Sequence, residues 1–164
     1  MKRTEMKYEK EITGMTASQY DEFLEQLLEE PCYVIDFLPR QVPADSTGQY
    51  FAVERFTREN PQISGLPHRF ADLMLRLNCY FDLAVGDGEH WSFNPAPEEL
   101  YRRIAGCPAT AFANMLIPGQ DSLITFNGDD LYMTLYHPSE ELLQTVKQLA
   151  AALGLFVRIG ANQP

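Results

Sequence analysis

The stretch Asn78-Cys79-Tyr80-Phe81-Asp82-Leu83-Ala84-Val85-Gly86-Asp87-Gly88-Glu89-His90-Trp91-Ser92-Phe93 lies in the middle of the chain and decides how the rest is interpreted. Two runs rich in aromatic and β-branched residues flank Gly86-Asp87-Gly88, and glycines readily adopt the backbone angles of a tight turn. The stretch therefore predicts a central β-hairpin. The segments before and after this hairpin have similar patterns of predicted strands and helices.

The chain before the hairpin predicts strand, helix, strand, strand, helix. Charged and apolar residues roughly alternate over residues 5–12, which is typical of a strand. Thr16 and Gln19 match a capping box, and the helix that follows ends at Pro31. The remaining elements are strands at residues 32–38 and 49–56 and a helix that begins at Pro67.

The chain after the hairpin predicts a similar series. A short helix begins at Pro97, and apolar stripes predict a helix after Pro138 that Gly154 ends. Asn127-Gly128 is a strong hairpin signal. The strands are predicted at residues 110–117, 123–126, 131–136 and 155–159.

A strand-helix-strand-strand-helix-strand unit resembles the ferredoxin-like topology. We therefore expect an α+β protein built from two tandem ferredoxin-like halves, residues 1–87 and 88–164, packed as one compact unit. This arrangement implies an antiparallel-rich sheet with its helices on one face. The topology hosts many unrelated functions, so the resemblance carries no function with it.

Composition excludes several classes of function. The 164-residue chain carries 23 acidic and 13 basic residues, a net charge of −10, so the basic surface of a nucleic-acid or membrane binder is not expected. No apolar run approaches the roughly 20 residues that span a bilayer. We expect a cytoplasmic protein in which Cys32, Cys79 and Cys107 are buried, reduced thiols.

If helices cover one sheet face, alternate strand residues must point to the other. Aromatic and charged residues share the predicted open face, which suits recognition of a protein, with tyrosines as anchors and charges that steer. A solvated or self-associating face is the competing interpretation. The residues singled out are Asp36, Tyr50, Glu54, Tyr80, Asp82, Tyr132, Tyr136 and Arg158.

The function expected is therefore non-enzymatic: an interaction or regulatory protein that binds a protein partner, with inhibition of a basic partner as a subclass. The alternative is a small-ligand sensor for an amino acid or carboxylate, with its site between the halves at Arg40, Gln41 and Gln120. No nucleophile, phosphate-loop or metal-ligand motif is present, so no cofactor is expected. An enzyme whose site is assembled from distant residues stays open.

Overall fold

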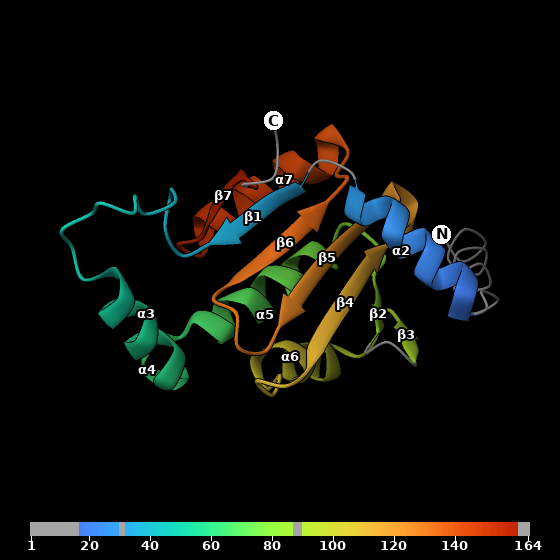
Figure 1. Ribbon diagram of the computed structural model, residues 1–164. Helices are drawn as coiled ribbons and strands as arrows, with labels where there is room; N and C mark the ends of the chain where they lie inside the picture. Colours follow the sequence, from blue (N-terminus) through green and yellow to red (C-terminus); the bar gives the residue numbers. More distant parts are fainter. Residues whose placement is uncertain (1–16, 30–31, 87–89, 161–164) are drawn as a thin grey trace.

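The computed structural model describes residues 17–29, 32–86 and 90–160 and has an α+β architecture (Figure 1). The helices are α2 (Ala17–Glu29), α3 (Tyr50–Glu59), α4 (Pro61–Ser64), α5 (Leu66–Leu77), α6 (Pro97–Ala105) and α7 (Glu140–Ala152), with a 3-10 turn at Pro118–Gln120. The strands are β1 (Cys32–Asp36), β2 (Ala84–Gly86), β3 (Trp91–Phe93), β4 (Phe112–Ile117), β5 (Ser122–Asn127), β6 (Tyr132–Tyr136) and β7 (Phe156–Ile159).

All seven strands form one antiparallel sheet in the order β3-β2-β4-β5-β6-β1-β7. Consecutive strands β4, β5 and β6 are neighbours, as short connections favour. β1 departs from this order, because it lies between β6 and β7, which come more than ninety residues later. The sheet therefore joins both predicted halves.

The central hairpin is confirmed: Gly86 pairs with Trp91 and Ala84 with Phe93. Its turn residues 87–89 lie outside the described residues, as do the predicted strand at 5–12 and the capping residue Thr16. Tyr80 to Leu83 were expected to belong to the strand, but Tyr80 ends the turn after α5, residues 81–83 are irregular, and β2 begins at Ala84.

The prediction of a strand at residues 49–56 is wrong, since helix α3 begins at Tyr50. Glu54 and Arg58 form an i,i+4 ion pair along this helix, with Nη2 and Oε1 3.2 Å apart. Without the strand, the described part of the first half lacks an element of the ferredoxin-like unit. The tandem arrangement stays unconfirmed, whereas the α+β class and the antiparallel sheet are confirmed.

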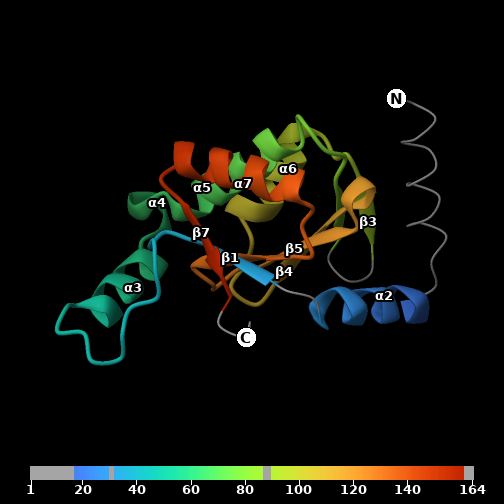
Figure 2. The same cartoon turned by 90° about the horizontal axis from the view of Figure 1, so that it is seen from above.

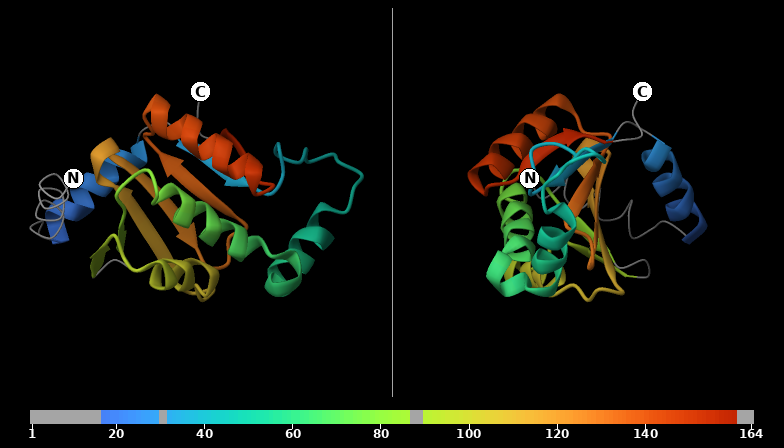
Figure 3. Two further views of the ribbon diagram at one scale, coloured as in Figure 1. Left: turned by 180° about the vertical axis from the view of Figure 1, so that it is seen from behind. Right: turned by 60° about the vertical axis from the view of Figure 1, so that its left-hand side comes forward.

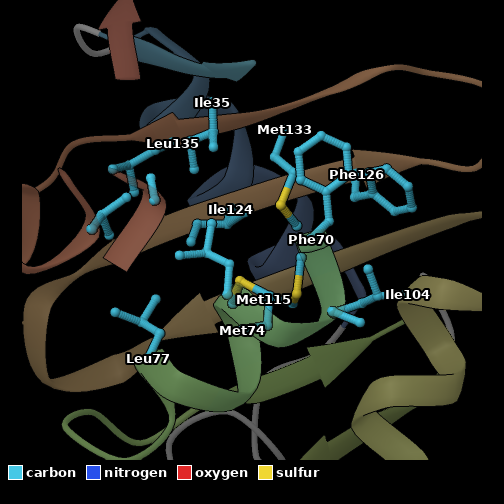
Figure 4. Close-up of a cluster of buried hydrophobic side chains, with 14 of the residues drawn as sticks. Ile35, Phe70, Met74, Leu77, Ile104, Met115, Ile124, Phe126, Met133 and Leu135 are labelled. Atoms are coloured by element: carbon cyan, nitrogen blue, oxygen red, sulfur yellow. The ribbon is translucent and has the colours of Figure 1, made fainter. Parts of the chain in front are cut away.

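The main core lies between the sheet and the layer of α5, α6 and α7 (Figure 3). Every second residue of a strand points to these helices, and the apolar residues that recur about every 3.6 positions on each helix point back to the sheet. Figure 4 shows Phe70, Met74 and Leu77 of α5 directed at Met115, Ile124 and Met133 of the sheet. Phe70 and Phe126 pack with their ring centroids 5.6 Å apart.

The opposite face carries a second, smaller core under α2. Leu27 is buried there with Ala84, Leu116 and Leu123, and Trp91 packs against this cluster. The expectation that all helices cover one face is therefore wrong for α2, which lies on the far side of the sheet from α5, α6 and α7 (Figure 2). None of the described helices is long and apolar enough to cross a membrane.

Candidate functional site

Beyond the cluster under α2, Phe112, Asn114 and Thr125 of β4 and β5 also face outward, and next to them lies a three-stranded part of the sheet formed by β6, β1 and β7. We call its outward residues the open face: Cys32, Val34, Asp36, Tyr132, Thr134, Tyr136, Phe156 and Arg158. They share a face because Val34 lies opposite both Thr134 and Arg158, and Asp36 opposite both Tyr132 and Phe156. All eight are half-buried or exposed in the chain as described.

The charges of the open face are paired. Arg158 donates a hydrogen bond from Nη2 to Oδ2 of Asp36 over 3.0 Å. The Arg158 side chain is 22% exposed and the Asp36 side chain is 14% exposed. The second Asp36 oxygen accepts the Leu38 N–H at 3.3 Å. The Arg158 Nε is buried and has no hydrogen-bond partner among the described residues. The centre of the face is therefore electrically neutral.

A hollow of about 320 Å³ lies over this neutral centre. Its floor comes from three strands, and Gln41 in the loop after β1 adds an amide side chain. The lining residues are Cys32, Val34, Gln41, Tyr132, Thr134, Tyr136, Arg158 and Gly160. Aromatic rings, hydroxyls and one amide make a surface that can accept both apolar contacts and hydrogen bonds.

Both tyrosines in the hollow stay protonated at neutral pH. Burial raises the pKa of Tyr132, and the negative charges of Asp130, Asp129 and Asp36 add to it, as does Tyr136. Burial is also the main reason for the raised pKa of Tyr136, although hydrogen bonds with Thr125 and Thr134 act in the opposite direction. Each phenol can therefore donate a hydrogen bond to a bound partner.

Exposed carboxylates lie on two elements outside the neutral centre. Asp21, Glu22 and Glu25 are exposed on α2, and residues 17–29 contain no Lys or Arg. Asp129 and Asp130 lie in the turn between β5 and β6, where their charges act on Tyr132. A neutral, aromatic centre with charged edges is the usual anatomy of a protein-binding surface.

Of the residues singled out for the open face, the structure brings four together: Asp36, Tyr132, Tyr136 and Arg158. Strand alternation was enough to place Tyr132, Tyr136 and Arg158 in β6 and β7, and Asp36 at the end of β1. Val34 and Cys32 belong to the same face and were missed, although the Cys32-Val34-Asp36 spacing already indicated it.

Tyr50 and Glu54 lie on helix α3 and not in the sheet. A hydrogen bond with Glu54 raises the pKa of Tyr50 to about 12, with burial and the charges of Glu54 and Asp36 acting in the same direction and Arg158 against it. The start of α3 is therefore within electrostatic range of the Asp36–Arg158 pair.

Tyr80 and Asp82 are not part of the open face. Both follow α5, which packs on the other side of the sheet, and Tyr80 is 69% exposed. Asp82 accepts a hydrogen bond from the Asn94 side chain over 2.9 Å. Asn94 in turn accepts from the Leu83 N–H and from Asn78. This polar cluster fixes the path of the chain into β2.

The residues of the alternative site do not come together. Gln120 follows β4 and accepts a hydrogen bond from the Ser139 hydroxyl, at the end of the sheet marked by Tyr136. Arg40 and Gln41 follow Asp36, whose partner is Tyr132 at the opposite end of β6. Of these three residues, Gln41 alone lines the hollow.

The described residues contain no group of three His, Cys, Asp or Glu side chains that could hold a metal ion. Cys32 and Cys107 are half-buried and unpaired, but Cys79 is exposed, contrary to the expectation that all three are buried. Comparison of the chain with protein-family models, curated proteins and solved structures finds no match. Its own geometry is therefore the basis for a functional proposal.

Proposed function

We propose that this chain is a non-enzymatic interaction or regulatory protein that binds a protein partner on its open face. One observation supports this most directly: a neutral, aromatic hollow lies on the open face, and the same molecule carries exposed carboxylates on α2 and in the turn between β5 and β6. Tyr132 in the hollow and Phe156 elsewhere on the open face are each 41% exposed and provide rigid contact area at small cost in conformational entropy.

The acidic edges favour a basic partner. The whole chain carries −10, so a basic protein is attracted over long range, and the edge carboxylates orient it as it approaches. Inhibition of such a partner, as an immunity-type or antitoxin-type protein performs, fits this charge. The cytoplasm is the compartment we propose, in keeping with three cysteines that form no disulfide.

The test uses three single variants of the full chain and partners captured from the source cells. Tyr132→Ala and Phe156→Ala should each weaken binding of the captured partner about tenfold or more, because truncating a central aromatic removes a contact that excludes water. Tyr80→Ala is the control, since Tyr80 is an aromatic residue that is even more exposed, at 69%, but lies away from the open face. Equal loss with Tyr80→Ala, or none with the other two, would contradict the proposal.

The salt dependence tests the role of the acidic edge separately. Raising NaCl from about 0.05 to 0.3 M should slow association and leave dissociation nearly unchanged, because exposed charges mainly steer the encounter. Replacing Asp21, Glu22 and Glu25 by their amides should also slow association at low salt, but less than the added NaCl does, because a net charge of −10 + 3 = −7 remains. If neither change alters the association rate, the α2 carboxylates do not steer the partner.

A second candidate, a small-ligand sensor, is favoured by the hollow itself. Its volume of about 320 Å³ is at the lower end for ligand sites, and Gln41 offers an amide at its margin. The expected ligand is a free amino acid or other small carboxylate. Such a ligand should raise the melting temperature of the wild type and not of Gln41→Ala. A site between two ferredoxin-like halves, as first expected, would instead be sensitive to Gln120→Ala.

A further inference from the structure

Strand β7 forms one edge of the sheet and has β1 as its neighbour on the other side. Figure 2 looks onto this edge, and no described helix or strand lies across β7 in that view. Proteins usually protect an edge with lysine, proline or a bulge. The sequence Phe156-Val157-Arg158-Ile159 has none of these, and its single charge is neutralised by Asp36.

The outward hydrogen-bonding groups of β7 follow from the ladder. The Gly160 N–H donates to the Cys32 carbonyl at 3.0 Å, so Gly160, Arg158 and Phe156 direct their backbone groups toward β1. Val157 and Ile159 must then direct theirs away from the sheet. No partner for these four N–H and C=O groups is found among the described residues.

We propose that β7 pairs in antiparallel orientation with β7 of a second copy of this chain, so that the two sheets become one. In the register we propose, Val157 lies opposite Val157 of the second copy and they exchange both backbone hydrogen bonds. The two-fold axis is perpendicular to the sheet, as an isologous contact of this kind requires. The inference does not depend on the proposed function.

The side chains of β7 select this register and this partner. Phe156 lies on the open face with Arg158, so each Phe156 ring comes opposite the Arg158 of the other copy and covers its guanidinium. A shift by two residues would place Arg158 opposite Arg158. The edge is also apolar on both sides of the sheet, since Phe156 is 41% and Ile159 62% exposed. Because this edge carries no net charge, two copies can associate through it although each chain carries −10.

The pairing would double the candidate site. A perpendicular two-fold axis keeps both open faces on the same side of the joined sheet. Arg158 and Gly160 belong to the hollow and lie on or next to β7, so the two hollows become neighbours across the axis. The assembly would present two identical sites to a symmetric or repetitive partner.

The first test replaces the central N–H. Val157→Pro removes a donor that faces solvent in a single copy, where proline is tolerated on an edge strand. The mass measured by sedimentation should be about twice 18.7 kDa for the wild type and 18.7 kDa for Val157→Pro. Val157→Ala is the matched control, because it loses a similar side chain but keeps the N–H, and it should stay dimeric.

The second test leaves the backbone unchanged. Ile159→Lys should weaken self-association at least about tenfold, since a charge is placed at the edge where the copies meet. Ile63→Lys is its control: Ile63 is 73% exposed on α4, away from β7, and the change should not alter the mass. A monomeric wild type overturns the proposal. So does a dimer that persists in both Val157→Pro and Ile159→Lys.

Discussion

At the residue scale, the backbone of Gly128 approaches another loop more closely than a side chain would allow. The Gly128 N–H donates to the Ala111 carbonyl at 2.9 Å, and a Cβ atom at this position would overlap the carbonyl oxygen of Pro108. The residue is therefore required by a contact between the β5–β6 turn and the segment before β4. The sequence indicated the turn but not this contact.

Gly128→Ala should lower the free energy of unfolding by about 1–3 kcal/mol, because the Pro108 loop must move to make room. Chemical denaturation measures the loss. Gly119→Ala provides the control: a Cβ there meets nothing within 4 Å, and the stability should stay within about 0.5 kcal/mol of the wild type. Equal effects of the two changes would contradict the close approach at Gly128.

Tyr50 offers a titration that reports on its surroundings. Its pKa is raised from 10.0 to about 12, first by the hydrogen bond with Glu54. Because the folded pKa is the higher one, the stability that this group contributes is fully present below pH 10 and is lost as the pH rises toward 12.

Glu54→Gln should therefore return the pKa of Tyr50 toward 10.0, as followed by the NMR shift of the ring or by phenolate absorbance. Glu59→Gln removes another carboxylate of the same helix and should leave the Tyr50 titration unchanged. If Glu54→Gln does not move the pKa, the hydrogen bond is not its main cause.

At the scale of elements, α3 and α4 form an arm that lies beyond the strand ends (Figure 1). Its apolar residues Phe51, Val53, Phe56 and Ile63 are 49–79% exposed, and Thr57 is the buried residue of the two helices. A long-range hydrogen bond from Arg58 Nε to the Asp129 carbonyl, 3.1 Å long, links the arm to the turn between β5 and β6.

The arm should contribute little to global stability. Phe51→Ala is expected to change the free energy of unfolding by less than about 0.5 kcal/mol, whereas Phe70→Ala should cost about 3–5 kcal/mol because Phe70 is fully buried. Amides of α3 should also exchange with solvent faster than those of α5, as measured by hydrogen exchange. Strong protection of α3 would mean that the arm is covered in solution.

The elements with a buried stripe could be predicted from the sequence, and those without one could not. α7 was predicted because Leu142, Val146 and Ala150 recur on one side, and Ser139 caps it by accepting the Leu142 N–H. Residues 50–59 have no such buried stripe, since Phe51, Val53 and Phe56 are exposed and Thr57 is the buried residue of the helix. A strand there would have needed a neighbour, and no local pattern specifies one.

The candidate site divides in the same way. Tyr132, Tyr136 and Arg158 could be placed because strand alternation is a local property. The pairing of Asp36 with Arg158, and the cover that α2 gives to Ala84, depend on contacts between distant segments. Neither the spacing of apolar residues nor the amino-acid composition predicts such contacts.

At the scale of the whole molecule, an excess of negative charge opposes compactness. The net charge is −10, and two of the three ion pairs among described residues are partly exposed i,i+4 pairs, worth about 0.3–0.5 kcal/mol each. Self-repulsion therefore outweighs ion pairing. The melting temperature should rise as NaCl increases from zero to about 0.15 M, where charges are screened beyond roughly 8 Å.

Differential scanning calorimetry checks this expectation, with Asp21→Asn, Glu22→Gln and Glu25→Gln combined as the comparison. The triple variant removes three exposed carboxylates from α2, so its melting temperature should be higher at low salt and respond less to NaCl. A melting temperature that falls on adding salt would show that attractive pairs dominate.

The position of β1 between β6 and β7 has a consequence for synthesis of the protein. Asp36 leaves the ribosome 122 residues before its ion-pair partner Arg158, an interval of roughly 6–25 s at about 5–20 residues per second. Until Tyr132–Tyr136 of β6 is synthesised, β1 has neither of its neighbours, whereas the hairpins of β2 with β3 and of β4 with β5 can already form. The nascent chain therefore exposes an unpaired apolar strand for most of its time on the ribosome, and holding chaperones that bind such segments have a defined target in residues 32–36.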